Sequence, residues 1–281
     1  MRKLAEILIG GQIAIALIVT LITAYVAEVL KGYAPPEVLG AAFLVTWLVY
    51  ASDRYFKHRE DETGAADDLS PARYIERHRR MFQGLFAVAA LALIGLVVYE
   101  PQVLWGLTWG LGWGLAYTVE LPLLKRRLKA IPYLKAIYVA TVVVTTPLAL
   151  MGALPANVAQ ASLIIGFTLL MILNAILCDL KDREGDRAAG IRTFANCTSK
   201  PVVVIGVQVL CIVAGVTLLG VVGVNRFTAA LAASALALAL AASRFYGQTE
   251  APNWYYFLVI DGILVLPWGL LHIMSLIDLA A

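Results

Sequence analysis

Residues 157–193 read NVAQASLIIGFTLLMILNAILCDLKDREGDRAAGIRT, a long apolar run followed directly by acidic and basic residues. The apolar part, 157–178, is long enough to cross a bilayer as a helix, which takes about 20 residues. Two acidic residues of the polar part, Asp182 and Asp186, are four apart, so on a helix both project from one face. Such a pair can share a hard cation such as Mg²⁺. The stretch therefore predicts a membrane helix that ends in a polyphosphate site, with an ordinary solvated turn as the alternative.

Apolar runs of this kind recur along the whole chain. Hydrophobic residues make up 61% of its 281 residues, and the runs are too long and too continuously apolar for the alternating strands of an outer-membrane barrel. We therefore predict an all-α integral membrane bundle, with residues 1–281 forming a single membrane-embedded domain. Nine transmembrane helices are expected, at residues 5–30, 37–56, 81–99, 102–119, 133–152, 157–178, 201–223, 227–243 and 253–276.

The basic residues give this topology a direction. If the N-terminus is cytoplasmic, the basic residues within 54–80, 125–135 and 181–200, together with Arg244, fall on the cytoplasmic side, and only Lys31 and Arg226 fall on the other. We expect a multi-pass protein of a prokaryotic cell membrane, with its polar loops in the cytoplasm. The net charge of +3 follows from membrane insertion, so no nucleic-acid partner is expected. The three cysteines lack metal-ligand spacing and are expected to be reduced.

The acidic stretch resembles a motif of a known family. Residues 179–193, DLKDREGDRAAGIRT, are similar to the second aspartate-rich motif of the UbiA superfamily of intramembrane prenyltransferases, and nine spans also match that family. Residues 117–135 resemble the family's segment that links the fourth and fifth helices. The first aspartate-rich motif departs from the family pattern of an asparagine and two aspartates at intervals of four, because these positions hold Val49, Asp53 and Lys57.

The resemblance implies Mg²⁺-dependent transfer of an isoprenyl group from an isoprenyl diphosphate to an aromatic or lipid acceptor within the bilayer. The metal ligands it implies are Asp53, Asp179, Asp182 and Asp186. The catalytic residues it implies are Asp53, Asp182, Asp186 and Tyr117. The expected diphosphate contacts are Asn174, Arg54, Lys57, Thr118, Lys125, Lys129, Lys135 and Arg192. A guanidinium or ammonium group can offset phosphate charge directly, so Lys57 can stand in for a metal; simple snorkelling is the alternative for a lysine at a helix end.

Several functions remain open from the sequence. The acceptor can be a quinone-precursor aromatic, a tetrapyrrole or a lipid glycerol. An intramembrane UbiA-type terpene cyclase would use the same ionisation and capture the cation within the prenyl chain itself. A non-catalytic lipid-binding protein or a secondary transporter is a further alternative, although a transporter places its decisive polar groups near the middle of the membrane, whereas this chain gathers them at one end.

Two features inside the apolar runs also stand out. The fourth predicted helix repeats an aromatic residue and a glycine every four positions, which predicts a close helix contact beside an aromatic face that either packs against helices and lipid or lines an isoprenoid channel. The residues are Trp105, Trp109, Trp113 and Tyr117, with Gly106, Gly110 and Gly114. Asp261 lies well inside the ninth predicted span, so we expect it to face the bundle and either pair with a basic group or accept a proton.

Overall fold

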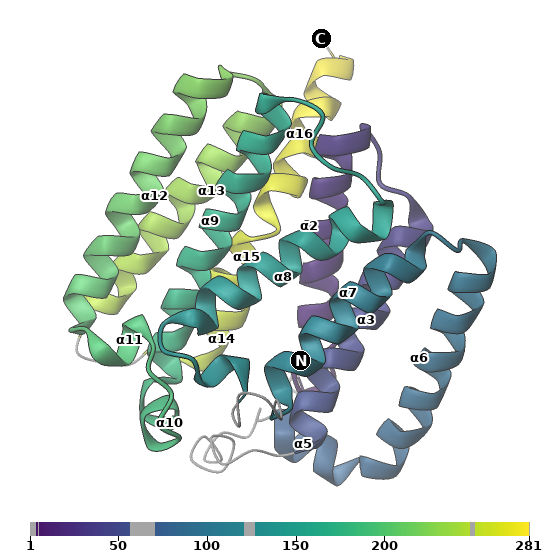
Figure 1. The fold of residues 1–281 in the computed structure, drawn as a ribbon. Helices are drawn as coiled ribbons and strands as arrows, with labels where there is room; N and C mark the ends of the chain where they lie inside the picture. The colour runs from purple at the N-terminus through teal and green to yellow at the C-terminus, as the bar shows by residue number, and fades with distance from the viewer. Residues whose placement is uncertain (1–3, 5, 57–70, 121–126, 248–250, 281) are drawn as a thin grey trace.

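The computed structural model describes residues 4, 6–56, 71–120, 127–247 and 251–280, and the described part contains helices and no strand (Figure 1). The predicted all-α membrane bundle is therefore confirmed. In chain order the helical elements are η1 (Glu6–Gly10), α2 (Ile13–Lys31), α3 (Pro36–Tyr55), α5 (Pro71–Arg77), α6 (Arg79–Tyr99), α7 (Val103–Thr118), η2 (Leu128–Ala130), α8 (Leu134–Met151), α9 (Val158–Lys181), α10 (Arg183–Ala188), α11 (Phe194–Cys197), α12 (Lys200–Val222), α13 (Arg226–Ala242), η3 (Ser243–Tyr246), α14 (Asn253–Tyr255), η4 (Tyr256–Ile260), α15 (Asp261–Ile263) and α16 (Leu266–Ala280).

Six helices of the described chain are long and apolar enough to cross a membrane: α2, α6, α8, α9, α12 and α13 with η3. A seventh crossing is counted if the last segment is one span, although it bends by 62° between Ile263 and Leu266. Helices α3 and α7 form where spans were predicted, but α3 ends in charged residues and α7 has only 16 residues. The protein is thus a multi-pass membrane protein, and the number of nine crossings stays a prediction.

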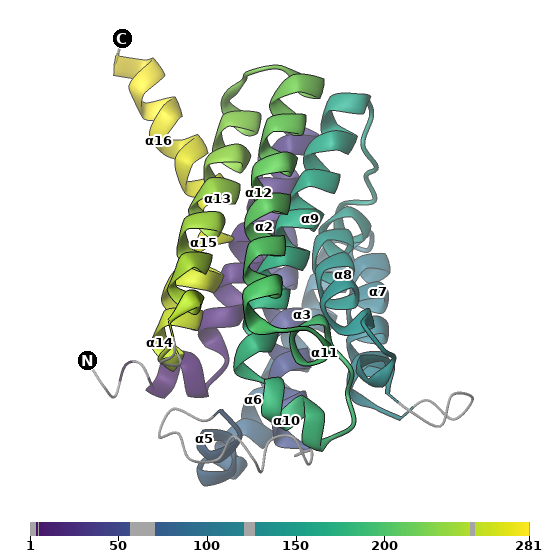
Figure 2. The ribbon, with the colours of Figure 1, turned by 90° about the vertical axis from the view of Figure 1, so that its left-hand side faces the viewer.

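The first and last predicted spans are not continuous α-helices. The chain begins with the π-helix η1, and Gln12 then takes a left-handed φ of 61° before α2 starts. The indole of Trp47 in α3 donates a hydrogen bond to the carbonyl of Gly11 at this break, at 2.9 Å. Near the other end of the chain, η4 is again a π-helix and is followed by the 62° bend. Figure 2 shows α16 leaning away from the bundle beyond this bend.

The glycines of α7 bring that helix close to two neighbours. A Cβ atom at Gly106 would lie 2.4 Å from the side chain of Leu150 in α8, and one at Gly114 would lie 2.5 Å from the side chain of Val49 in α3. Gly110 is enclosed by both neighbouring helices. The predicted close approach beside α7 is confirmed, and it fixes α3 and α8 relative to each other across α7.

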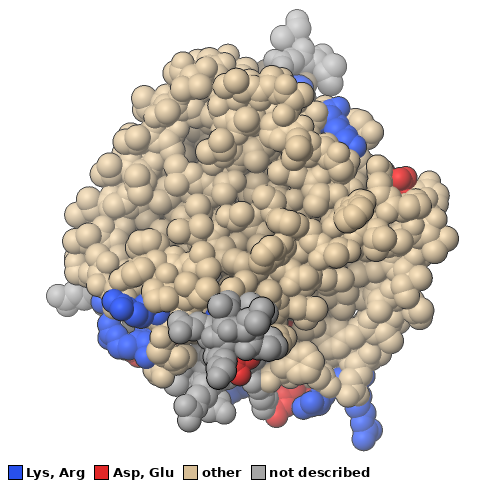
Figure 3. Space-filling view, viewed as in Figure 1, with Lys and Arg blue, Asp and Glu red and all other residues tan. Residues whose placement is uncertain are grey.

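One end of the bundle gathers the polar segments. Helices α5, α10 and α11 and the N-terminal element η1 lie at this end in both views (Figures 1 and 2). On the face seen in Figure 3, most of the charged side chains lie along the same lower edge, and the middle of the face is almost free of them. This distribution fits a bundle whose sides meet lipid and whose functional groups sit at one mouth.

Candidate functional site

The acidic loop begins where α9 stops. Asp182 joins α9 to the short helix α10, and the Asp186 amide donates to the Asp182 carbonyl at 2.8 Å, so the helical spacing of these two aspartates is kept. Gly190 then turns the chain with a φ of 74°. Thr193 and Asn196 close the loop with a reciprocal capping box at the start of α11. The loop is therefore held in one shape by its own hydrogen bonds.

The segment that precedes α8 is attached to this loop. Tyr133 takes a left-handed φ of 63°, and its amide donates to the carbonyl of Arg192 at 2.8 Å. Its ring packs against Phe194 with centroids 5.1 Å apart. These contacts set the start of α8 beside the acidic loop and direct Lys135, in the first turn of α8, toward it.

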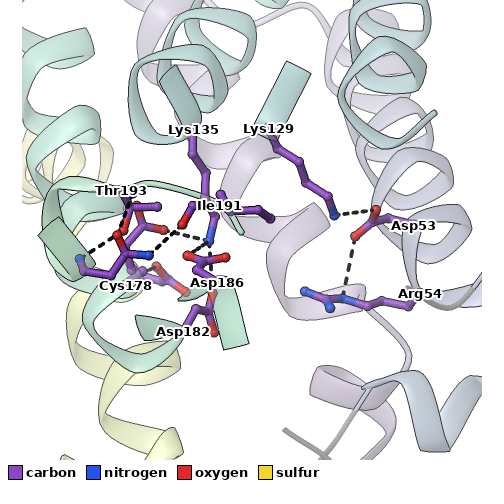
Figure 4. Close-up of polar contacts among 12 residues, drawn as sticks. Asp53, Arg54, Lys129, Lys135, Cys178, Asp182, Asp186, Ile191 and Thr193 are labelled. Atoms are coloured by element: carbon purple, nitrogen blue, oxygen red, sulfur yellow. Dashed lines mark hydrogen bonds and ion pairs between the residues drawn. The ribbon is translucent and has the colours of Figure 1, made fainter. Parts of the chain in front are cut away.

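Lys135 lies among the three aspartates of the second motif (Figure 4). Its Nζ is 2.8 Å from an oxygen of Asp186, 2.9 Å from one of Asp179 and 3.6 Å from one of Asp182. The side chains of Asp179 and Asp186 are 7% and 4% exposed, whereas that of Asp182 is 52% exposed. In the structure its ammonium is the counter-charge of the acidic cluster, and its predicted contact with phosphate stays a prediction.

A second ion-paired group faces the first from α3. Lys129 of η2 is buried, and its Nζ lies 3.5 Å from Oδ1 of Asp53. The Arg54 Nε lies 3.9 Å from the other oxygen of Asp53. Figure 4 shows Lys129 and Lys135 reaching down between α3 and the acidic loop. The surviving aspartate of the first motif thus meets a lysine and an arginine.

Tyr117 lies near both of these groups. Its ring stacks on Tyr138 of α8 at 5.6 Å, and the ammonium of Lys129 is 5.6 Å from its centroid. It interacts electrostatically with Lys135, Asp179 and Asp53, so it borders both. The neighbouring residue Thr118 is buried, and its hydroxyl donates to the Leu115 carbonyl of its own helix at 3.1 Å.

Other predicted contacts lie apart from these groups. The exposed Arg192 turns toward Tyr133, with an Nη atom 3.5 Å from the phenol oxygen. It also lowers the pKa of the exposed Cys197 by hydrogen bonding to the thiol. Asn174 is buried and donates to the Ile260 carbonyl at 2.7 Å. Two further predicted contacts, Lys57 and Lys125, lie outside the described residues.

The acidic cluster has the right donor chemistry for a hard cation, because carboxylate oxygens are the ligands that Mg²⁺ prefers. One ammonium offsets only one of the three carboxylate charges around Lys135. Within the described residues, no three His, Cys, Asp or Glu side chains stand in a metal-binding arrangement as they are. The Lys135 ammonium lies 2.8–3.6 Å from all three carboxylates, so these residues would hold Mg²⁺ only with the lysine displaced.

Two further side chains near these groups, Tyr50 and Cys178, were not predicted from the sequence to belong to the site. Tyr50 of α3 interacts electrostatically with Asp53 and with Asp261. Cys178 of α9, directly before Asp179, donates a thiol hydrogen bond to Asp261 at 3.4 Å. The only available signal was spacing: Tyr50 precedes Asp53 by one turn, and Cys178 follows Asn174 by one turn.

Comparison with known proteins bears on these groups directly. The profile of the UbiA prenyltransferase family matches residues 16–264, a range that includes both acidic groups and Asp261. No curated protein and no solved structure matches the chain. The fold and the motifs are therefore interpreted through the family as a whole.

Proposed function

The chain belongs to the UbiA prenyltransferase family, and from that premise we propose that it transfers an isoprenyl group from an isoprenyl diphosphate to a hydrophobic acceptor within the membrane, with Mg²⁺ as cofactor. The observation that carries the proposal is the placement of two lysine-bearing acidic groups at one mouth of an apolar bundle. Lys135 lies within 2.8–3.6 Å of three aspartates, and Lys129 lies 3.5 Å from Asp53. Lysines and carboxylates in one place are what a metal-bound diphosphate requires.

Each group has a separate task in this proposal. Asp179, Asp182 and Asp186 hold Mg²⁺, which when bound offsets the charge that develops on the departing diphosphate. Lys129 and Lys135 donate to phosphate oxygens, and Arg54 adds a planar donor beside Asp53. The ring of Tyr117 borders the reacting end of the isoprenoid, where an aromatic face stabilises a cation. The apolar helices keep water from the allylic cation until the acceptor captures it.

We place this mouth of the bundle in the cytoplasm. The acidic loop and the linker carry several basic residues. Lys31, the last residue of α2, and Arg226, the first residue of α13, lie at the helix ends away from this mouth. Short loops rich in lysine and arginine stay on the cytoplasmic side. A prokaryotic cell membrane is the location that fits this arrangement.

The test is product analysis with purified protein, Mg²⁺ and prenyl diphosphates of several lengths, with and without acceptors. An acceptor adduct together with released diphosphate supports transfer, and a cyclic hydrocarbon supports the terpene cyclase instead. Asp186→Asn should reduce turnover more than tenfold, a loss of about 1.4 kcal/mol in the barrier. Glu184→Gln is the matched control, because Glu184 is an exposed carboxylate of the same loop. Wild-type protein that releases no diphosphate with any donor or acceptor would refute the proposal and leave the lipid-binding and transport alternatives.

A further inference from the structure

Asp261 lies inside the last membrane segment. Its carboxylate belongs to neither of the two acidic groups described above. It follows the π-helix η4 directly and precedes the 62° bend of this segment. A charged group at such a depth is costly unless it is paired or functional. Its surroundings decide between these two possibilities.

A hydrogen bond from α9 and one within the segment itself hold the backbone at this point. Asn174 Nδ2 donates to the Ile260 carbonyl at 2.7 Å, and the Leu264 amide turns back to the Asp261 carbonyl at 3.1 Å. The Ile260 carbonyl thus has a side-chain partner at a place where the regular helical pattern is interrupted. These bonds fix the backbone of Asp261 against α9.

The Asp261 carboxylate has no strong counter-charge. Its hydrogen-bond donor is the Cys178 thiol at 3.4 Å, a weak donor. In the described part of the chain, no Lys, Arg or His nitrogen lies within 4 Å of it, so the ion pair considered from the sequence is absent there. Lys181 interacts with it only at longer range, and the Lys181 ammonium lies 4.8 Å from the ring centroid of Phe257.

Asp261 is also close to the candidate diphosphate site. Its donor Cys178 is the residue before Asp179 in α9, and Asp261 interacts electrostatically with Asp182. From α3, Tyr50 interacts electrostatically with both Asp53 and Asp261, so it lies near each of them. Cys178, Tyr50 and Asp261 are all half-buried. Polar side chains therefore extend from the acidic groups to Asp261.

We propose that Asp261 is the proton acceptor of the prenyl transfer and that the acceptor substrate is a hydroxyl compound, an alcohol or a phenol. This inference rests on the proposed function. The allylic carbon–oxygen bond breaks and its electron pair leaves with the diphosphate. The acceptor oxygen then donates a pair to the allylic carbon, and the hydroxyl proton passes to the Asp261 carboxylate. The products are the prenyl ether, diphosphate and a neutral carboxylic acid, which balances atoms and charge.

The geometry suits this role because a carboxylate with one weak thiol donor keeps acceptor capacity for a substrate hydroxyl. The facing ionisable groups are Cys178 and Lys181 on α9, Asp182 directly after α9, and Tyr50 on α3.

The test compares Asp261→Asn and Asp261→Glu with wild-type protein, measuring ether formation with a hydroxyl acceptor and, separately, pyrophosphate binding in the presence of Mg²⁺. We expect Asp261→Asn to lose transfer by about 100-fold or more, the range of a general base, with pyrophosphate affinity changed less than twofold. Asp261→Glu should recover part of the transfer. Glu28→Gln is the control, because this half-buried carboxylate contacts Trp268 and His272 in the outer part of the bundle.

Two results would overturn the inference. Transfer by Asp261→Asn at the wild-type rate would show that another group, such as the leaving diphosphate, takes the proton. Loss of pyrophosphate binding in both Asp261 variants would assign the carboxylate a structural role. Failure of the proposed function has a different signature, since wild-type protein would then form no adduct and release no diphosphate.

Discussion

Replacing Lys135 by methionine tests how the acidic cluster is held together. Methionine keeps most of the length of the side chain and removes the ammonium that lies 2.8 Å from Asp186 and 2.9 Å from Asp179. Those two carboxylates are nearly buried, so neither water nor salt can screen them well. Without the lysine, they stay close together and lose the ammonium that offsets their charge.

The expected cost follows from this burial. Removing one partner of a buried ion pair destabilises a protein by about 3–5 kcal/mol. The exposed Asp182 adds less than about 1 kcal/mol, as surface pairs do. In a chain of this size about 1 kcal/mol shifts the midpoint of thermal unfolding by about 2–4 °C. We therefore expect Lys135→Met to unfold about 6–20 °C below the wild-type protein when divalent cations are chelated.

Added Mg²⁺ should reverse much of this loss. A cation that binds the folded cluster stabilises it by mass action, and the carboxylates of the variant are no longer occupied by Lys135. The midpoint should rise more with Mg²⁺ in Lys135→Met than in wild-type protein. Tryptophan fluorescence in nanodiscs, with EDTA and then with excess MgCl₂, measures both midpoints.

Lys200→Met is the matched control. The Lys200 ammonium donates to the Gly247 carbonyl at 3.4 Å at the surface, so its loss should change stability by no more than about 0.5 kcal/mol. An EDTA midpoint of Lys135→Met equal to that of wild-type protein would refute the role of Lys135 as counter-charge. Equal rises with Mg²⁺ in both proteins would refute the idea that lysine and metal compete for the same carboxylates.

Three further predictions concern packing, acidity and orientation. Gly106→Ala should cost about 1–3 kcal/mol by overpacking, because the new Cβ would lie 2.5 Å from the backbone of Leu150, whereas Gly112→Ala should be neutral or stabilising since nothing lies within 4 Å. The pKa of Cys197 is lowered by hydrogen bonding from Arg192, so its thiolate forms at lower pH than that of an ordinary cysteine, and Arg192→Gln should raise the midpoint of its alkylation-rate profile; equal midpoints would contradict this. Impermeant labels on single cysteines placed at Asp67 and Thr198 should react from the cytoplasmic side, and labels at Pro35 and Asn225 from the other side. Labelling of positions 67 and 198 from opposite sides would refute the shared site.

The sequence was sufficient where a pattern is local. The four-residue repeat of glycines in α7 predicted close helix contacts, and the structure has them at Gly106 and Gly114. The spacing of Asp182 and Asp186 predicted their common face, which the hydrogen bond between their backbones preserves. Both features depend on the helical period alone, so no distant contact is needed to predict them.

The sequence was not sufficient to predict which of several distant residues a side chain contacts. A lysine in a cytoplasmic linker serves equally well as a topology signal, a phosphate contact or an ion-pair partner. Lys135 meets the aspartates because the left-handed turn at Tyr133 and its bond to Arg192 set the start of α8 against the acidic loop. That bond joins residues 59 positions apart, so no local sequence pattern predicts it.

Helix interruptions escaped prediction for a related reason. Mean hydropathy over a window is the same for an α-helix and for a π-helix, so residues 253–276 suggested one continuous span. The structure breaks this span, and Asn174 from another helix bonds the Ile260 carbonyl beside the break. The predicted substrate contact of Asn174 stays a prediction; in the structure its buried amide donates to the Ile260 carbonyl, directly before Asp261.

In the first motif, a residue that departs from the family pattern makes a contact with a neighbouring helix. Val49 stands where the family has an amide, and its side chain packs against Gly114, where an added Cβ would lie 2.5 Å from it. Position 49 therefore serves the contact between α3 and α7. The neighbouring Asp53 meets Lys129, and the other acidic group meets Lys135, so the segment 128–135 supplies one lysine to each group. Because an ammonium can bind diphosphate without a metal, we propose that Lys129 helps to hold the substrate beside this altered motif.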